Sequence, residues 1–166
     1  MAQTDLRKYG TEERLNKMDL DVISVDPTCD PSGTDDADVL FDFTEIPYAA
    51  SVDGGSCLLH SIQLLDDDDV GGKLDLVFAT ANTALGTLDA AISITDANAQ
   101  NILGYVRLED YFDGINWQMS TSTSIGLAMK CAEGTRSLYV AGVNRNGASV
   151  THVAAGIHLK IGIVKD

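Results

Sequence analysis

Residues 156–164, with the sequence GIHLKIGIV, give the clearest indication of the fold class of this 166-residue chain. Apolar residues occupy every second position, and polar or small residues lie between them: Ile157, Leu159, Ile161 and Ile163 alternate with His158, Lys160 and Gly162. Side chains of a β-strand point to opposite faces in turn. The segment therefore predicts a strand with one buried face and one solvated face.

The same alternation recurs along most of the chain. It predicts further strands at residues 39–43, 57–65, 73–79, 90–95, 105–108, 117–120, 124–132 and 136–143. Asp96 is suited to begin a short helix over residues 97–103, which Gly104 would end. Short strands at near-regular spacing predict an all-β fold, an antiparallel β-sandwich of jelly-roll-like form.

Composition and charge narrow the class of partner. The formal net charge of −14 disfavours direct binding to nucleic acid and to anionic membrane surfaces, because their phosphates would repel the chain. Twenty aspartates against five glutamates favour turns and loops over helices. No apolar run reaches the roughly 18 residues that a membrane-spanning helix needs. We therefore expect a protein made in a reducing cytoplasm.

The N-terminal segment differs from the rest. Residues 1–18 carry four basic and three acidic side chains, or +1, so the remainder carries −15. Residues 19–38 contain seven aspartates and two prolines, which disfavour a buried backbone. We expect an extended N-terminal arm, residues 1–38, and a β-sandwich body, residues 39–166; a floppy terminus is the alternative. The candidate partner-binding residues lie in the arm: Arg7, Lys8, Tyr9, Arg14, Leu15 and Lys17.

Two groups of residues could bind a metal ion. The aspartates from Asp66 to Asp69 are followed by two glycines, but the spacing fails the EF-hand pattern at its fifth and twelfth positions. A solvated acidic turn is the favoured interpretation. Of the three histidines, His152 and His158 have no usual zinc spacing, and His60 fits a hydrogen-bonded core histidine. We expect no metal and no cofactor.

Motifs for catalysis are missing. Ser56 and Cys57 follow two glycines, but neither a GxSxG nucleophile elbow nor a phosphate-binding Walker A loop is present, and we expect no enzyme. Residues 109–114, with Tyr111 and Phe112, form the best candidate binding loop together with Trp117. A turn whose aromatic side chains cover the edge of the core is the favoured interpretation of this segment.

Three segments, residues 74–78, 94–104 and 137–143, resemble a group of small virion structural proteins of tailed bacteriophages. The resemblance covers roughly residues 45–164 and transfers no functional residue. It implies a capsid cement, or decoration, protein that binds the outside of the assembled capsid and stabilises it by bridging subunits of the major capsid protein. It also implies a homotrimer located on the virion after synthesis in the host cytoplasm.

Other functions stay open at this point. A tail or head-fibre component is possible under the same resemblance. A host-recognition module could bind carbohydrate or Ca²⁺ through Trp117, Tyr111 and the turn that begins at Asp66. A hydrolase that uses Cys57 or scattered carboxylates is the weakest hypothesis, because the motifs are missing.

Overall fold

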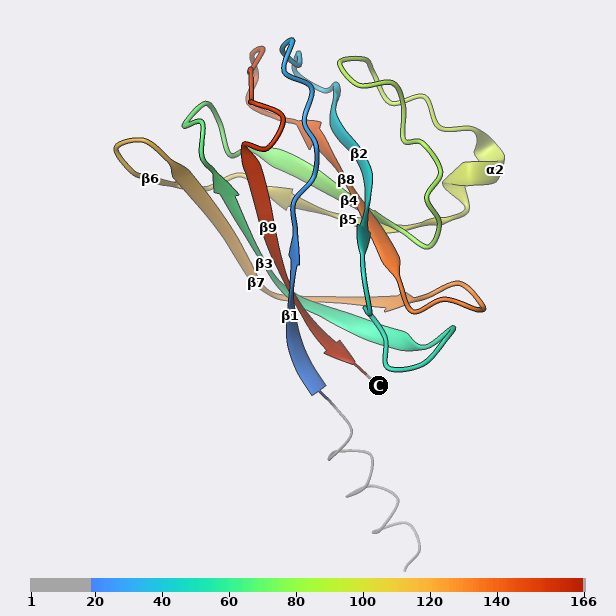
Figure 1. Ribbon diagram of the computed structural model, residues 1–166. Coiled ribbons are helices and arrows are strands. Elements are labelled where there is room, and N and C mark those ends of the chain that lie inside the picture. Colours follow the sequence, from blue (N-terminus) through green and yellow to red (C-terminus); the bar gives the residue numbers. More distant parts are fainter. Residues whose placement is uncertain (1–18, 166) are drawn as a thin grey trace, which may run out of the picture.

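The computed structural model describes residues 19–165, which form two antiparallel sheets packed face to face (Figure 1). The prediction of an all-β sandwich is confirmed. The elements are β1 (Asp19–Val25), β2 (Val39–Ile46), β3 (Ser56–Asp66), β4 (Leu74–Ala79), α2 (Asp96–Ala99), β5 (Ile102–Leu108), β6 (Phe112–Asp113), β7 (Gln118–Lys130), β8 (Leu138–Asn144) and β9 (Ile157–Lys165).

The strand order is that of a jelly roll. One sheet has the order β1-β9-β3-β7-β6 and the other has the order β2-β8-β4-β5. Apart from β6, the first strand pairs with the last, the second with the last but one, and so on. The pairs are β1 with β9, β2 with β8, β3 with β7 and β4 with β5. These four ribbons alternate between the two sheets, which is how one long hairpin rolls into a double sheet.

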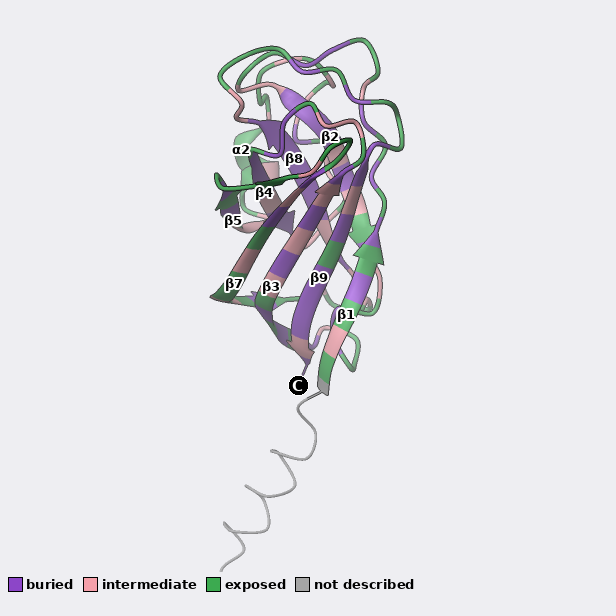
Figure 2. Ribbon diagram, turned by 90° about the vertical axis from the view of Figure 1, so that its left-hand side faces the viewer, coloured by how far each residue is buried: buried purple, intermediate pink, exposed green. Residues whose placement is uncertain are grey.

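The main core lies between the sheets, and its strands show the expected alternation. In β9 the four predicted apolar residues are all buried, whereas Lys160 is exposed, so the interpretation of this strand is confirmed. Figure 2 shows the same buried stripes along β3 and β9. Fully buried large side chains from both sheets fill the interior: Phe41, Phe78, Leu40, Ile46, Leu59, Ile62, Leu64, Leu74, Leu76, Leu138, Ile157 and Leu159.

A second, smaller core lies on the outer face of the β2-β8-β4-β5 sheet. The long β4–β5 connection folds over this face, and Leu85 from the connection packs with Phe43 and Val143. Residues 90–95 are part of that connection, so the prediction of a strand there is wrong; only Ala91 makes a single bridge, to Asp38. The connection contributes apolar side chains to this smaller core without forming a regular ladder of strand hydrogen bonds.

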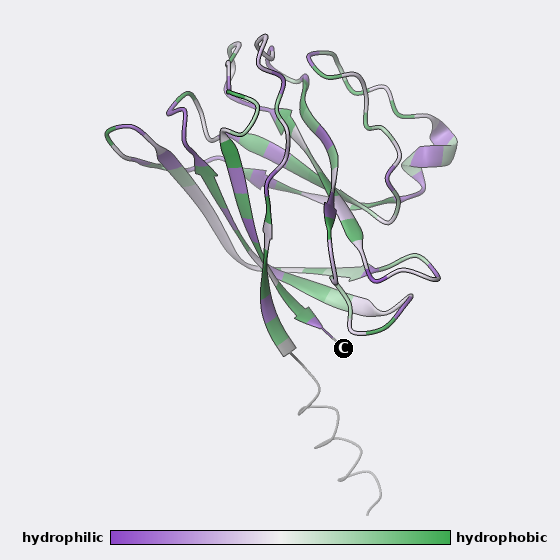
Figure 3. Cartoon of the chain, in the orientation of Figure 1, coloured by the Kyte–Doolittle hydropathy of each residue, from purple (hydrophilic) through white to green (hydrophobic). Residues whose placement is uncertain are grey.

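The predicted helix is present but shorter than expected. It begins after Thr95, whose hydroxyl accepts a hydrogen bond from the backbone N–H of Asn98, so Thr95 and not Asp96 is the N-cap. Figure 3 shows α2 as largely hydrophilic, and none of its residues is buried. The apolar residues Ile102 and Leu103, which were assigned to the helix, belong to β5.

The predicted boundary of the arm at residue 38 is wrong. Residues 19–25 form β1, an edge strand paired with β9 from Asp19 opposite Lys165 to Val25 opposite Leu159. Leu20 and Val22 are exposed on the outer face of β1. Ile23 and Val25 are buried on the face that packs on the core. The body therefore includes residues from 19 onwards. Residues 1–18 lie outside the described part of the chain.

A β-bulge explains why the expectation for His60 was wrong. The pairing of β3 with β7 and β9 shifts between Leu59 and Ser61, so one residue of β3 is left out of the ladder. This residue is His60, and it is exposed to solvent. The bulge reverses the side-chain alternation, which returns Ile62 and Leu64 to the core.

The sandwich has two distinct ends. We call the end where Asp19 lies opposite Lys165 the terminal end, because β1 begins and β9 finishes there. At the opposite end, the loop end, the connections from β1, β3 and β8 are hydrogen-bonded to one another. Cys29 N–H donates to the Ala154 carbonyl (3.0 Å), and Asp67 N–H donates to the Gly156 carbonyl (2.9 Å). The loop end is therefore a fixed surface.

Candidate functional site

The candidate partner-binding residues Arg7, Lys8, Tyr9, Arg14, Leu15 and Lys17 all lie outside the described residues. The described chain begins at the terminal end of the sandwich. There the Lys165 ammonium forms an ion pair with the Asp21 carboxylate (2.7 Å), which holds the start of β1 against β9. The start of β1 is therefore fixed at the terminal end.

An exposed apolar hairpin lies at the loop end. We give this name to residues 111–117, which run from Tyr111 through β6 to Trp117. Ile115 at its tip is 91% exposed and Phe112 is 62% exposed. The Phe112 and Trp117 rings lie 5.6 Å apart, and Gly114 N–H donates to the Trp117 carbonyl (2.8 Å). Phe112 does not cover the edge of the core, whereas Tyr111 and Trp117 are only 42% and 37% exposed, so the interpretation as a covering turn is contradicted for Phe112 alone.

The base of the apolar hairpin is fixed to the body. Gln118 and Ser120 directly follow it and are buried, and the Ser120 hydroxyl donates to the Gly72 carbonyl (3.1 Å). A Cβ at Gly72 would lie only 3.5 Å from Tyr111 Cβ, so the hairpin packs closely on the β3–β4 turn. Exposed apolar side chains on a fixed support are typical of an interaction surface.

A hollow of about 340 Å³ lies beside this hairpin and opens to solvent. Its lining is polar and comes from the end of β5, the residues that follow it and the adjacent part of β7: Arg107, Leu108, Glu109, Asp110, Thr121 and Ser122. The sequence placed Glu109 and Asp110 in the candidate binding loop. The structure adds Thr121 and Ser122, which only the pairing of the strands could bring there.

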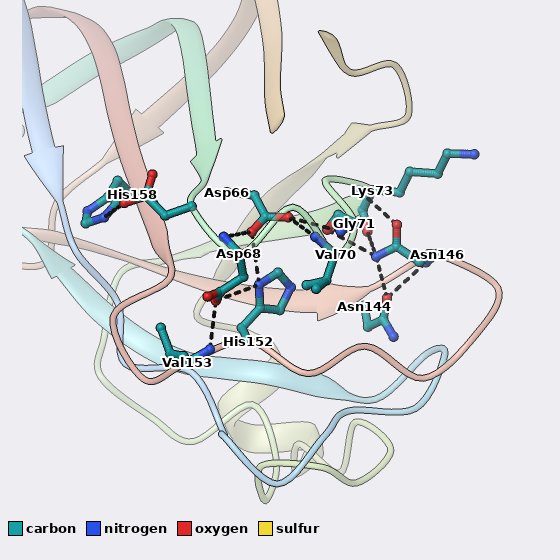
Figure 4. A network of polar contacts seen from close by, with 11 residues as sticks. Asp66, Asp68, Val70, Gly71, Lys73, Asn144, Asn146, His152, Val153 and His158 are labelled. Atoms are coloured by element: carbon teal, nitrogen blue, oxygen red, sulfur yellow. Dashed lines mark hydrogen bonds and ion pairs between the residues drawn. The ribbon is translucent and has the colours of Figure 1, made fainter. Parts of the chain in front are cut away.

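The acidic turn is more than a solvated loop. Asp66 is fully buried, and its carboxylate accepts backbone N–H groups from Asp68 (2.9 Å), Val70 (3.1 Å) and Gly71 (3.0 Å) (Figure 4). Burial would raise the pKa of Asp66, but the contact with His152 and these N–H groups outweigh burial and hold the pKa below its ordinary value. For Asp66, the favoured interpretation of a solvated turn is therefore wrong.

The two C-terminal histidines both contact this turn. His152 is fully buried beside Asp66 and Asp68, while His158 lies between Asp26 (2.8 Å) and Asp67 (3.1 Å). The contact with Asp26 and the charge of Asp67 raise the pKa of His158 above its ordinary value. The sequence missed these contacts because no short spacing connects residue 152 with residue 66.

The cysteines are poorly placed for nucleophilic catalysis. Cys57 and Cys131 are buried in the main core. Burial, together with the negative charges of Asp68 and Asp66, raises the pKa of the Cys29 thiol to about 12. A thiol with so high a pKa stays protonated at neutral pH, and only the thiolate is a strong nucleophile.

The comparisons with known proteins give little guidance. No protein-family model and no curated protein match the sequence. Among solved structures, the chain is similar to dimeric latent PorU from Porphyromonas gingivalis, with a TM-score of 0.25 and 8% sequence identity. The match covers 90% of this chain and 13% of that chain, and a likeness this weak carries no functional argument. Within residues 19–165, no helix has the length and apolar character needed to span a bilayer.

Proposed function

We propose that this chain is a structural protein of a bacteriophage virion, a capsid cement protein that binds the outside of the assembled capsid and bridges subunits of the major capsid protein. It acts without catalysis, as a homotrimer, on the virion surface. The observation that carries the proposal is a jelly-roll body with an exposed apolar hairpin at the end opposite the start of β1. Jelly rolls are common in viral capsid domains.

The two ends provide what bridging requires. A cement protein needs at least two separate contacts so that one molecule can hold neighbouring subunits together. The apolar hairpin supplies one contact, with Phe112 and Ile115 extended into solvent. The candidate partner-binding residues, with Arg7 and Arg14 among them, supply the other in this proposal. Many copies on one shell turn modest contacts into strong overall binding.

The number of copies per virion tests the proposal most directly. We expect quantitative mass spectrometry of purified virions to find this chain and the major capsid protein in a ratio near one. A ratio of a few per hundred would instead indicate the tail or a fibre. Absence of the chain from purified particles would contradict a virion role altogether.

A variant of the hairpin tests the proposed contact. The Phe112→Ser, Ile115→Ser double variant should bind at least about tenfold more weakly to capsids purified from a phage that lacks this coding sequence, because it removes exposed apolar anchors. Tyr105→Ser is the matched control, since Tyr105 on β5 is also 62% exposed. Equal binding of both variants and the wild type would show that the hairpin is not a capsid contact.

Carbohydrate recognition on a host surface is the second candidate function. The observation that favours it is the polar hollow lined by Arg107 and Glu109, which lies beside exposed aromatic side chains. Sugar binding by this site would depend on Trp117, and a Trp117→Ala variant would lose it on a glycan array. Binding to purified capsids with no glycan binding would exclude this candidate.

A further inference from the structure

Three side chains from two distant segments converge at the loop end. Asp66 and Asp68 come from the β3–β4 turn, and His152 comes from the β8–β9 connection (Figure 4). One ligand atom of each lies within 4.8 Å of the other two. His152 Nδ1 is 3.3 Å from Asp66 Oδ1 and 3.7 Å from Asp68 Oδ2.

The histidine has no hydrogen bond of its own within the described residues. His152 is 0% exposed, yet neither Nδ1 nor Nε2 has a hydrogen-bond partner in residues 19–165. Burial of a polar group without a hydrogen-bond partner is unfavourable. Because Nδ1 points at the carboxylates of Asp66 and Asp68, His152 is positioned to coordinate an ion that lies between them.

We propose that Asp66, Asp68 and His152 bind one first-row divalent metal ion, with Zn²⁺ the best match, in place of the expectation from the sequence that no metal is bound. Zinc binds imidazole nitrogen and carboxylate oxygen at about 2.0–2.2 Å in tetrahedral geometry. Two ligand atoms of such a tetrahedron lie about 3.3–3.6 Å apart. The two distances from His152 Nδ1 are close to this separation.

The ligand types and charges also favour a metal of this kind. Calcium and magnesium prefer sites made of oxygen ligands, whereas imidazole suits zinc and its neighbours in the first transition row. Asp66 and Asp68 with a neutral His152 carry a charge of −2, which one divalent cation balances. Three protein ligands leave a fourth tetrahedral position open for a water molecule or a group from a partner.

The backbone holds both carboxylates in position for this role. Asp66 is oriented by the N–H groups of the turn, and Asp68 Oδ2 accepts the Val153 N–H (2.7 Å). Gly156 is required here because a Cβ at this position would overlap the Asp68 carboxylate. Such contacts outside the ligand shell fix the geometry of a metal site. The Asp68 side chain is 18% exposed, so a cation can enter from its side.

The ion would connect the β3–β4 turn to the β8–β9 connection and so stabilise the loop end. The inference stands apart from the proposed function, since a metal site is compatible with a cement protein or a sugar-binding module. The competing explanation for the cluster is a buried ion pair, in which a protonated His152 is shared by two carboxylates. That arrangement would leave the stability of the protein insensitive to added metal.

The test uses the untagged full-length chain, stripped with EDTA and desalted. Addition of Zn²⁺ at about 100 times its Kd should raise Tm by about 5–10 °C, because the ion binds the folded state alone. Mass spectrometry for metals should find one zinc retained per chain. Equal concentrations of Ca²⁺ and Mg²⁺ should shift Tm much less. No retained zinc and no shift in Tm would overturn the proposal.

Variants locate the site. His152→Gln and Asp68→Asn should each weaken zinc binding at least about tenfold, because even the loss of a contact outside the ligand shell costs about 10–100-fold in metal affinity. If the buried His152→Gln variant fails to fold, Asp68→Asn alone tests the site. Asp68 is partly exposed, so this substitution disturbs the core less. His158→Gln is the matched control, since His158 lies between the exposed carboxylates of Asp26 and Asp67. Loss of zinc in this control, with retention in Asp68→Asn, would also overturn the proposal.

Discussion

Replacement of Asp75 by asparagine is expected to lower the free energy of unfolding by about 2 kcal/mol at neutral pH. Asp75 lies on the outer face of β4 with a side chain only 7% exposed. Arg107 donates two hydrogen bonds to its carboxylate (2.7 and 2.9 Å), and Arg145 Nε donates a third (2.6 Å). The substitution would leave two guanidinium groups close together without their shared anion.

The effect of this variant should depend on pH. Burial would raise the pKa of Asp75, but the hydrogen bonds and charges of Arg107 and Arg145 outweigh burial and hold the pKa below its ordinary value. A carboxyl whose pKa is lower in the folded state stabilises the protein above its unfolded pKa of about 3.9. That contribution is lost as the pH falls through the folded pKa. The difference between wild type and variant should therefore shrink in acid.

Urea unfolding at pH 7 and at about pH 3 measures this difference. Glu109→Gln is the control, because Glu109 is an exposed partner of Arg107 at 3.9 Å and exposed ion pairs contribute little, about 0–1 kcal/mol. Two results would contradict the prediction: free energies of unfolding of wild type and Asp75→Asn that differ little at pH 7, or a difference that stays constant into acid. Either result would show that the ion pairs of Asp75 with Arg107 and Arg145 do not stabilise the fold.

Strands were predictable where their pattern was local. The alternation in β9 and β4 requires only neighbouring residues, and both strands lie where the sequence placed them. Residues 19–25 contain four apolar side chains, but the alternation breaks between Val22 and Ile23, and the aspartates and prolines of the surrounding segment suggested an exposed arm. Pairing with β9 satisfies the backbone of this edge strand, while Asp19 and Asp21 alternate with apolar residues along it. The composition of residues 19–38 as a whole therefore concealed the short strand β1 within them.

The candidate sites depended on contacts that the sequence does not display. His152 reaches Asp66 because the jelly roll brings the β3–β4 turn and the β8–β9 connection to the same end. His60 was assigned to the core by simple alternation, and one bulge residue reversed its direction. The cluster of Tyr111, Phe112 and Trp117 was visible because the three residues are close in sequence, but the sequence did not show that Phe112 is exposed. Local clusters are visible in a single sequence, whereas sites made by topology are not.

Gly142→Ala is expected to destabilise the protein by about 2–3 kcal/mol, although its backbone conformation suits any residue. Gly142 lies on β8 directly opposite Phe41 of β2, and both face the main core. The Phe41 ring fills the space where a side chain at position 142 would lie, so a Cβ there would overlap the ring. The closely packed sandwich gives the ring little room to move.

A double-mutant cycle with Phe41→Leu separates this clash from other effects. Phe41→Leu alone should cost about 1 kcal/mol, because the swap keeps most of the apolar volume. In that background the additional cost of Gly142→Ala should fall by at least about 1 kcal/mol, since the smaller side chain leaves space for the methyl group. Urea unfolding of the four proteins measures both quantities. Strictly additive costs would mean that Phe41 does not cause the penalty and would contradict the prediction.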